Sequence, residues 1–516
     1  MNRVIRIQPQ ALRWLVVLSV LLALTASPAK ASPLYDHTLL VNNSGDAGSL
    51  PCTGFTPNDC DLRSALQLAN THFTESYFIW FASDMTINLT SELPGLNNTN
   101  KLVVDGQGHV VKIDGQNAVY NIFYITGANI SILNLRMYRS KVNSSQIYVD
   151  GGSSILIASN IIGASEPMSS CADGSPDSYG GVFVSSPIPQ STQIVDNIIR
   201  CNLGNPGNGV DIYYSDQVVV GINPGSTGET GNVITDNHGD GVLDQYSSAT
   251  VIAGNSISNN DQYGIAALAS TAPLIQQNTV DQNTSYGVFL SHGPSDEPHG
   301  TVQAVIGCAA DGASDDGNVI TRNSMGIVLD GANTHDNLIA CNTIGFPGAG
   351  NTYSGVMVTD AAHHNQIGQF IEHTNLISSN GEYGVLLYID VHDNTVSGNI
   401  IGLDKTLTVA QPNALGGILL DRAAAGNIIG IPDNLHSVQY IAGNTGPGIF
   451  VYFTNGTIIN ERNWIGSETP GLGNTGDGIL IHESSRTSLL GSFIRNNGGA
   501  GISVTGSGNS NRVIPF

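Results

Sequence analysis

A phrase repeated between Gly231 and Val504 constrains the fold of this chain more than any other feature. Each copy contains Asn-x-Ile or Asn-x-Val, followed about ten residues later by Gly-Ile or Gly-Val, one variable residue and an aliphatic residue. Copies read GNVITDNHGDGVL from Gly231, GNSISNNDQYGIAAL from Gly254, QNTVDQNTSYGVFL from Gln277, GNVITRNSMGIVL from Gly317, TNLISSNGEYGVLL from Thr374 and RNWIGSETPGLGNTGDGILI from Arg462. Because Asn232, Asn255 and Asn278 recur every 23 residues, one copy has the length of one rung of a parallel β-helix and is too short for a propeller blade or a pair of helices.

The longer intervals between copies fit the same architecture. Asn278 and Asn318 are 40 residues apart, which we interpret as one rung that carries an inserted loop. A solenoid grows in one dimension, so the length of this chain does not require several cores. Charged residues make up only 11% of the sequence, while glycine occurs 61 times, which favours short strands and tight turns. The sequence therefore predicts an all-β, single-stranded parallel β-helix.

The first 31 residues have the pattern of a secretion signal. They contain three early arginines, an apolar run from Trp14 to Leu24, and the small-x-small tripeptide Ala29-Lys30-Ala31. This pattern predicts a signal peptide over residues 1–31 and a mature chain that begins at Ser32. No later segment has the roughly 18 consecutive apolar residues that a spanning helix needs. We therefore expect an exported protein, secreted or at the cell surface, with no membrane span in the mature chain.

The net charge limits the partners. It is −23, with only 18 lysines and arginines. Nucleic acid is excluded as a partner, because its binding needs clustered positive charge that displaces counterions. A polyuronate ligand would need bridging cations or a local arginine patch to overcome the negative field.

Six cysteines in an exported chain predict three disulfides. Cys52 and Cys60 are close enough to close a short loop. In each of the other two pairs, the first cysteine opens a polar insertion and the second precedes a rung. The simplest connectivity is Cys52–Cys60, Cys171–Cys201 and Cys308–Cys341. Fifteen pairings remain open from sequence alone.

The segment from Asp61 to Asn70 is the best helix candidate after residue 31. Its residues Leu62, Ala65, Leu66 and Ala69 share one helical face, and Asp61 suits the N-cap position. An open β-helix end exposes strand edges and core side chains. We therefore expect this amphipathic helix to cap the N-terminal end.

The segment Cys60-Asp61-Leu62-Arg63-Ser64-Ala65-Leu66-Gln67-Leu68-Ala69-Asn70 resembles the Cys-Ser-Leu-Arg-Glu-Ala-Ile…Ala-Asn signature of CSLREA-domain proteins. It departs from that signature at Asp61, Ser64 and Leu66. The resemblance implies export and a right-handed parallel β-helix of the pectin-lyase-like type, and it implies fold more strongly than chemistry. The expected organisation is a signal peptide over 1–31, a cap region over 32–100, β-helix repeats over 101–504 and a tail over 505–516.

The rung pattern also predicts which side chains point outward. In Gly-Ile-x-Leu-x, the period of two sends Ile and Leu inward and both variable residues outward. The first outward column is apolar and consists of Leu243, Ala266, Phe289, Val328, Met357, Leu386, Leu419, Phe450 and Leu480, flanked by Asp211 and Ser503. Either inserted loops cover this stripe or a ligand binds it. The recurrent asparagines are expected to stack as a structural ladder of amides.

The second outward column carries the candidate site. It contains Tyr213, Ser291, Asp330, Thr359, Tyr388, Asp421, Tyr452 and His482, with Asp360, Asp390, Arg422 and Glu483 just beyond. Tyr388 and Tyr452, with Asp330 and Tyr213, are predicted to bind sugar rings. The candidates for acid–base chemistry are Asp390, Asp421, Arg422, His482 and Glu483. The alternative is a solvated polar face without a site.

Sequence motifs favour no particular reaction or cofactor. Similar folds host polygalacturonases, but this chain has neither Gly-His-Gly nor Arg-Ile-Lys. The acidic turns Asp173–Asp177 and Asp311–Asp316 offer oxygen ligands for calcium, but neither has the spacing of a known calcium motif, and ordinary Gly/Asp turns explain both. The histidines lack zinc-binding spacing, and no glycine-rich loop precedes a helix. No cofactor is therefore expected, and calcium is kept as an alternative.

The functional prediction is a non-catalytic extracellular or cell-surface protein that binds glycans or other surface partners. A first alternative is a polysaccharide lyase, glycoside hydrolase or epimerase that uses the same outward face. A second is a passive structural scaffold. Convergence of all five acid–base candidates in an open groove, with shifted pKa values, would favour the enzyme. The absence of a groove, with the apolar stripe buried under loops, would favour the scaffold.

Overall fold

The computed structural model describes residues 35–53, 56–167, 171–174, 179–186, 191–224, 226, 228–293, 299–308, 316–369, 373–431, 438–508 and 510–514. The predicted signal peptide and most of both acidic turns lie outside these residues. The chain divides into two units, Met1–Asp36 and His37–Phe516, and the described strands belong to the second.

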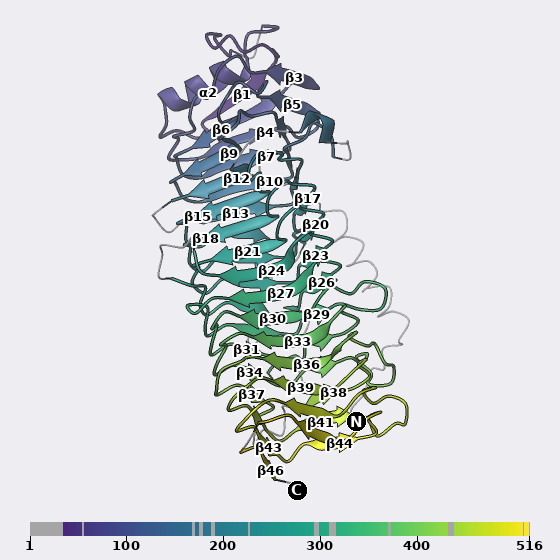
Figure 1. Cartoon of the computed structure of the whole chain (residues 1–516). Coiled ribbons are helices and arrows are strands. Elements are labelled where there is room, and N and C mark those ends of the chain that lie inside the picture. Colours follow the sequence, from purple (N-terminus) through teal and green to yellow (C-terminus); the bar gives the residue numbers. More distant parts are fainter. Residues whose placement is uncertain are drawn as a thin grey trace, which may run out of the picture. The chain divides into compact units, whose positions relative to one another are not determined.

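Three parallel sheets run along this unit (Figure 1). The first sheet consists of β1 (His37–Val41), β2 (Tyr77–Phe81), β4 (Leu102–Asp105), β7 (Ile130–Leu133), β10 (Ile155–Ala158), β13 (Thr192–Val195), β16 (Val219–Gly221), β19 (Val251–Ala253), β22 (Leu274–Gln276), β25 (Val305–Gly307), β28 (Leu338–Ala340), β31 (Gln366–Ile367), β34 (Thr395–Val396), β37 (Ile428–Ile429), β40 (Ile458–Ile459), β43 (Ser488–Leu490) and β46 (Arg512–Ile514).

The second sheet consists of β3 (Met85–Asn88), β5 (Val111–Asp114), β8 (Arg136–Tyr138), β11 (Ile161–Ile162), β14 (Ile198–Arg200), β17 (Val233–Thr235), β20 (Ser256–Ser258), β23 (Thr279–Asp281), β26 (Val319–Thr321), β29 (Thr343–Ile344), β32 (Leu376–Ile377), β35 (Ile400–Ile401), β38 (Gln439–Ile441), β41 (Asn463–Gly466) and β44 (Phe493–Arg495).

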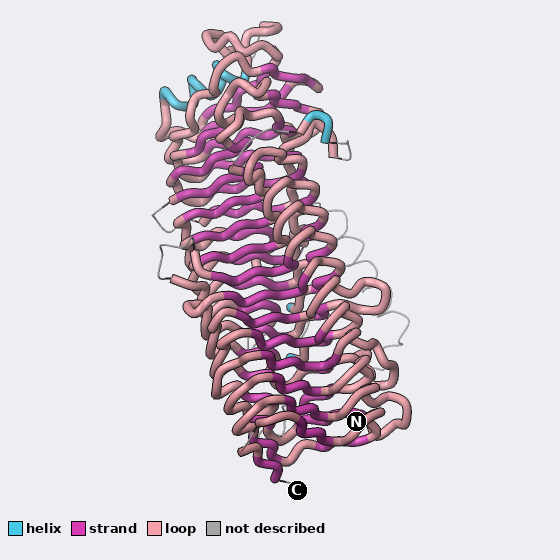
Figure 2. The backbone as a smooth tube through the Cα atoms, viewed as in Figure 1, coloured by secondary structure: helices cyan, strands magenta, loops and turns pink. Residues whose placement is uncertain are grey.

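The third sheet consists of β6 (Phe123–Ile125), β9 (Ser145–Asp150), β12 (Gly180–Ser185), β15 (Val210–Tyr213), β18 (Val242–Gln245), β21 (Ile265–Leu268), β24 (Tyr286–Ser291), β27 (Met325–Asp330), β30 (Val356–Thr359), β33 (Tyr383–Tyr388), β36 (Gly416–Asp421), β39 (Ile449–Tyr452), β42 (Ile479–His482) and β45 (Ile502–Thr505). Strands of successive turns lie side by side in Figure 2, and their pairing is parallel. The predicted parallel β-helix is therefore confirmed.

The core is a set of aliphatic columns inside the coil. Val210, Ile265 and Ile327 belong to one third-sheet column, and each is fully buried. Because successive strand residues point to opposite faces, the residue between two core positions points outward. The predicted pattern of inward and outward positions is thus confirmed in the repeat region.

Columns of side-chain amides run beside the core, as predicted. Asn232 Nδ2 donates to Asn255 Oδ1 at 2.9 Å, and Asn255 Nδ2 donates to Asn278 Oδ1 at 3.0 Å. A second column links Asn237 and Asn260, whose Nδ2 and Oδ1 atoms are 3.0 Å apart. These asparagines are almost fully buried. Their role is therefore structural, because each amide satisfies backbone and side-chain groups that the coil removes from water.

The predicted N-terminal helix is present as α2 (Leu62–Thr71), and its N-cap is Asp61, whose carboxylate accepts from Ser64 N at 2.7 Å. Arg63 anchors this helix to the loop that connects β1 to α2, because its Nε and Nη2 atoms lie 2.9 Å from the carboxylate oxygens of Asp46. Arg63 also donates to the carbonyl oxygens of Ser91 and Glu92. The buried apolar face of α2 packs into the core beneath it.

The three predicted disulfides are present: Cys52–Cys60, Cys171–Cys201 and Cys308–Cys341. Cys171 begins the short 3-10 helix η1 (Cys171–Asp173). Each of the two longer bridges therefore ties an insertion to the following rung.

Paired strands extend beyond both ends of the expected repeat region, residues 101–504. β1 pairs with β2 before residue 101, and β46 pairs with β43 after residue 504. Among the helices in the described part of the chain, none has the length and apolar composition that spanning a bilayer requires.

Candidate functional site on the outer face of the third sheet

The third sheet presents two continuous columns of outward side chains. The first outward column begins with Tyr124, Tyr148 and Phe183. These lie on the rungs that precede Asp211 and the predicted apolar stripe. The stripe then continues in register to Ser503. The second column likewise includes Gln245 and Leu268, which the sequence pattern omitted.

Neighbouring side chains cover part of the apolar stripe. Ala266 and Val328 are buried at 0% and 1% exposure. The ring of Tyr263 lies 4.7 Å from that of Phe289, and the ring of Tyr286 lies 5.5 Å from it. Tyr263, just before β21, and Tyr286, the first residue of β24, therefore shield the middle of the stripe, and Phe289 is half-buried.

An aromatic run occupies the N-terminal part of this face. The ring centroids of Tyr124 and Tyr148 are 5.4 Å apart, and those of Tyr148 and Phe183 are 5.0 Å apart. Tyr179 stacks on Phe183 at 5.3 Å. Because rungs lie about 4.8 Å apart, in-register aromatic residues form a nearly continuous surface. We call Tyr124, Tyr148, Tyr179 and Phe183 the aromatic run.

Two adjoining cavities open beside the aromatic run. One, of about 380 Å³, is lined by Tyr120, Tyr124 and Tyr148, and the other, of about 360 Å³, by Tyr148, Tyr179 and Phe183 among others. Both also contact Asn121. Because they share Asn121 and Tyr148, the two cavities form one aromatic-walled depression.

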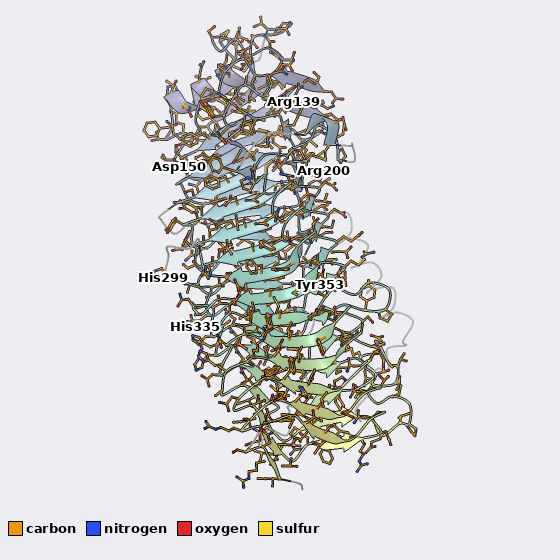
Figure 3. The ribbon with its side chains drawn as sticks, viewed as in Figure 1. Arg139, Asp150, Arg200, His299, His335 and Tyr353 are labelled. Atoms are coloured by element: carbon orange, nitrogen blue, oxygen red, sulfur yellow. A yellow bond between two sulfur atoms is a disulfide. The ribbon has the colours of Figure 1, made fainter. Side chains whose placement is uncertain are left out.

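A carboxylate lies at the aromatic run. The Tyr124 hydroxyl donates a hydrogen bond to Asp150, whose position on the third-sheet side is labelled in Figure 3. This hydrogen bond, with burial and the charge of Asp150, raises the pKa of Tyr124 to about 12. Burial likewise raises the pKa of Tyr148. Both phenols therefore stay protonated and can donate hydrogen bonds at neutral pH.

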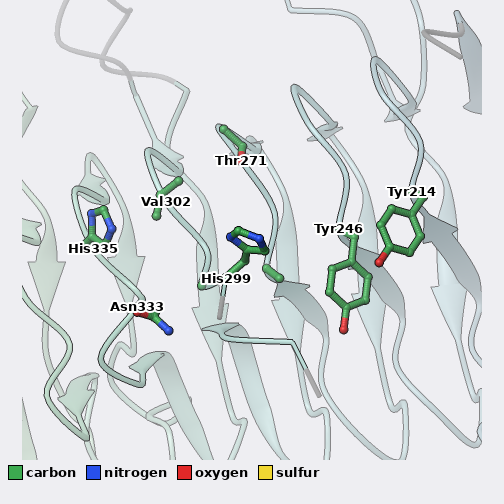
Figure 4. A pocket seen from close by; sticks show the side chains of 9 residues that line it. Tyr214, Tyr246, Thr271, His299, Val302, Asn333 and His335 are labelled. Atoms are coloured by element: carbon green, nitrogen blue, oxygen red, sulfur yellow. The ribbon is translucent and has the colours of Figure 1, made fainter. Parts of the chain in front are cut away.

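A second aromatic cluster follows at the next turns. Tyr214 and Tyr246 stack at 4.7 Å, 11° from parallel, and the exposed Tyr213 meets the Tyr214 ring edge-on at 4.6 Å. Tyr214 and Tyr246 line a cavity of about 440 Å³ together with His299 and His335 (Figure 4). Tyr213, which the sequence predicts as a binding residue, lines the cavity of about 360 Å³ beside the aromatic run. It therefore lies between the two depressions.

Histidines stack along the turns that leave this face. His335, His363 and His392 are in register, with ring distances of 4.9 and 4.8 Å. Burial, followed by the neighbouring histidines, lowers the pKa of His363. His364 Nδ1 lies 2.7 Å from His363 Nδ1. We call His335, His363 and His392 the histidine stack.

Asp330 and Asp360 form a carboxyl pair in the second column. Burial raises the pKa of Asp330, and its hydrogen bond to Asp360 raises it further. Ser291 Oγ donates to Asp330 Oδ2 at 3.0 Å. A half-buried carboxyl with a raised pKa keeps its proton to a higher pH than a free carboxyl does, and in its protonated form it can act as a hydrogen-bond donor or general acid.

Three further carboxyls are buried near β15 and β18. Burial raises the pKa of Asp211 to about 8, that of Asp240 to about 7 and that of Asp244 to about 7. Asp244 points into the core, because strand register pairs it with Ile212 and Ala267. All three therefore hold protons well above the usual range for aspartate.

The structure brings three predicted residues together around Arg422. Its Nη2 donates to the Tyr388 hydroxyl at 2.8 Å, and its Nε lies 3.1 Å from Asp421 Oδ1. Its guanidinium carbon lies 4.9 Å from the Tyr388 ring centroid. Asp390 is exposed at the adjoining turn and meets Arg422 through a backbone hydrogen bond of 2.9 Å.

The remaining predicted residues lie nearer the C-terminal end. Tyr452 and His482 stack at 5.6 Å, and His482 Nδ1 lies 2.8 Å from Thr505 Oγ1. Glu483 accepts hydrogen bonds from the backbone N–H and hydroxyl of Ser507, which lower its pKa. Glu483 is therefore engaged by the final turn, and the five acid–base candidates are spread from β33 to β42.

No group of three or more His, Cys, Asp or Glu residues suited to a metal occurs in the part of the chain that the structure describes. Calcium binding at the acidic turns stays a prediction, since Ser175–Asp177 and Asp311–Asp315 lie outside that part.

The aromatic run was missed because its strands precede the recognised repeat. The alternation of inward and outward residues was nevertheless visible in three segments and would have placed their central aromatic residues outward. These segments are FYI (123–125), QIYVD (146–150) and GVFVS (181–185). Tyr179, Tyr214 and Tyr246 come from turns, whose side-chain directions the strand period does not predict.

A family model described as the right-handed β-helix region matches residues 220–303. The fold is a right-handed parallel β-helix. No curated protein matches the chain.

Solved structures similar to this chain include the periplasmic alginate epimerase AlgG, at 13% identity over 84% of this chain and 77% of that chain, with a TM-score of 0.36. The mannuronan C-5 epimerase AlgE4 A-module of Azotobacter vinelandii is 14% identical over 88% of this chain and 94% of that chain, with a TM-score of 0.36. The Dettilon tailspike protein is 15% identical over 77% of this chain and 66% of that chain, with a TM-score of 0.44. At these identities the similarity concerns the fold alone.

Proposed function

We propose that this chain is an exported protein that binds glycans without transforming them, along the outer face of the third sheet. The observation that carries the proposal is the aromatic run beside two adjoining cavities. Aromatic rings offer large rigid contact area, and Tyr hydroxyls add hydrogen bonds to a ligand that is apolar on one face and polar at its rim. A sugar ring has this character.

The charge of the chain favours neutral glycans. The net charge is −23, and Asp150 lies against the aromatic run. A polyanionic sugar would therefore be repelled at this site, whereas the hydroxyls of a neutral sugar can donate to the Asp150 carboxylate. Neutral polysaccharides are thus the expected ligands.

Export and the N-terminal cap belong to the same proposal. Three disulfides support an oxidising compartment, where such bonds persist. We infer that residues 1–31 are a signal peptide and that residues 32–100 form a CSLREA-type cap, for which the Asp61 N-cap and the anchored Arg63 are supporting features. Secretion or cell-surface display would expose the third sheet to extracellular glycans.

The test removes two rings from the aromatic run. The variant Tyr148→Ala/Phe183→Ala should bind neutral polysaccharides such as glucan, mannan and galactan about tenfold or more weakly than the wild type, measured by titration calorimetry. Phe450→Ala, in the same outward column but far along the coil, is the matched control and should retain binding. Loss with Phe450→Ala alone would move the site to the predicted C-terminal part of the face.

An enzymatic function on the same face is the second candidate, favoured by the raised pKa of Asp330 beside Asp360. A lyase, hydrolase or epimerase needs side chains that transfer protons, and a carboxyl with a raised pKa is suited to donate one. New reducing ends or unsaturated product, formed by the wild type and lost in Asp330→Asn or Asp421→Ala, would establish this candidate. A folded protein that neither binds nor transforms any polysaccharide tested would point to a passive scaffold.

A further inference from the structure

We propose a second ligand site on the outer face of the second sheet, where a hairpin covers a pocket that fits a small organic acid with an apolar body and one carboxylate. The pocket has a volume of about 280 Å³. Leu376, Ile400 and Tyr440 line it from successive rungs of β32, β35 and β38. The site lies on a different sheet from the proposed glycan face and does not depend on it.

The hairpin over the pocket spans residues 403–410 and is rigidly built. Leu403 and Ala410 form an antiparallel bridge. The Asp404 carboxylate accepts from Thr408 N at 2.8 Å and from Val409 N at 2.7 Å. Hydrogen bonds from the Thr406 side chain and from these backbone groups lower the pKa of Asp404 to about 2. Asp404 is therefore occupied by its own turn.

The far end of the hairpin is anchored to the coil. Gln411 N donates to Gly402 O at 2.8 Å, and Ser378 Oγ donates to Gln411 Oε1 at 3.0 Å. These bonds hold Leu407 and Lys405 over the pocket. A pre-formed wall lowers the entropic cost of binding, because it does not have to order when a ligand enters.

The lining specifies the ligand chemistry. The lining combines apolar side chains, among them Leu376, Ile400 and Leu407, with polar residues, and Lys405 adds a positive charge. The polar residues are Asn342, Thr343 and Thr374. Within the described residues, Lys405 has no recorded ion-pair or hydrogen-bond partner. A cation beside an apolar pocket complements a ligand with an apolar body and one anionic group.

An aromatic column continues from the pocket. Trp464 is in register with Tyr440, with ring centroids 6.0 Å apart, and Phe493 stacks on Trp464 at 5.0 Å. Trp464 thus lies one rung beyond the pocket wall and can report binding by its fluorescence. The chain contains three tryptophans, so Trp14→Phe/Trp80→Phe leaves Trp464 as the single reporter.

The experiment titrates this full-length double variant with matched pairs of probes. 3-Phenylpropanoate and octanoate supply flat and aliphatic bodies with a carboxylate, and 3-phenylpropanol and octanol are their uncharged counterparts. At least one acid should change Trp464 emission saturably and bind about tenfold more tightly than its alcohol. The stronger acid then tells whether an aromatic or an aliphatic body is preferred.

Substitutions test the role of the hairpin. Lys405→Met should abolish the preference for acid over alcohol, while Lys405→Arg should retain it. Leu407→Ala should weaken acid and alcohol alike, and Tyr148→Ala/Phe183→Ala should leave both unchanged. Circular dichroism verifies folding of each variant. The proposal is overturned if neither acid binds saturably, if acid and alcohol bind equally, or if Lys405→Met keeps the preference.

Discussion

The imidazole rings of His335 and His363 stack 4.9 Å apart and 7° from parallel, on equivalent turns of neighbouring rungs. His392 continues the stack on the other side, and His364 and Asp336 are the further titratable groups near His363. Protonation of the central ring places a charge between two like groups in a partly desolvated position. This arrangement explains why the pKa of His363 lies below its usual value.

Acidification should therefore destabilise the coil through His363. The unfolded chain binds a proton near pH 6.5, while folded His363 resists it, so the free energy of unfolding falls as the pH drops through this value. Urea denaturation of the wild type should show a steeper loss between pH 7 and 5 than His363→Gln. His238→Gln, which removes an exposed histidine paired with Asp261, is the control. Parallel pH profiles for the wild type and His363→Gln would contradict the explanation.

Ionisation of Asp244 should lower the free energy of unfolding as the pH rises, which is the opposite of the effect of His363. Its pKa is raised from 3.8 to about 7, so stability is lost as the pH rises between these values. Asp244→Asn removes this loss and should increase the free energy of unfolding by roughly 2 to 4 kcal/mol at pH 8, but only by about 1 to 2 kcal/mol at pH 5, where most of the loss has not yet occurred. Guanidinium denaturation at both pH values provides the measurement. The exposed Asp390→Asn should show neither effect, and an equal gain at pH 5 and 8 would exclude ionisation as the cause.

The bond between Arg63 and Asp46 should stabilise the N-terminal cap. Their side chains are 10% and 2% exposed, so Arg63→Leu leaves a buried carboxylate without its cation, at a cost of about 3 to 5 kcal/mol. Arg63→Leu/Asp46→Asn should recover part of that loss, because the charge is removed as well. Chemical denaturation followed by the fluorescence of Trp80, in the neighbouring β2, measures both. A cost below about 1 kcal/mol for Arg63→Leu would show that the pair is not required.

An interior amide should matter more than an exposed one. Asn283 Nδ2 donates to Asn323 Oδ1 at 3.1 Å, while its own Oδ1 accepts from Asn260 Nδ2 at 2.9 Å. Asn283→Ala strands both partners and should cost about 2 to 4 kcal/mol. Asn88→Ala, at an exposed position bonded to Gln116, should change stability by about 0.5 kcal/mol or less. Thermal unfolding of both variants tests this difference, and similar losses would refute it.

The sequence predicts this fold well because every rung follows the same short sequence pattern, which is repeated many times. Spacing of asparagines and the Gly-Ile-x-Leu pattern together determine the inward and outward faces, so positions such as Phe289 and Phe450 were assigned correctly. Neighbouring rungs then bring residues close that are far apart in sequence, such as Tyr388 and Arg422.

Contacts made by turns and insertions were harder to predict. Glu483 was expected beside His482 in an outward site, but its carboxylate bonds to Ser507 in the following turn. The pocket under residues 403–410 depends on the fold of an inserted hairpin, for which the rung period holds no information. Directions of side chains in turns follow from individual backbone angles, and Asp390, with a φ of 56°, is one example.

The amide columns have a consequence for how this protein can change. Neighbouring asparagines 23, 24, 35, 37 and 40 residues apart along the chain meet with the same geometry, at 2.9 to 3.0 Å. Chain length between two contacts is therefore decoupled from their distance in space. Segments that bear recognition surfaces can therefore be exchanged or lengthened while the interior asparagines keep their register. This makes the coil a scaffold that can acquire new binding specificities one rung at a time.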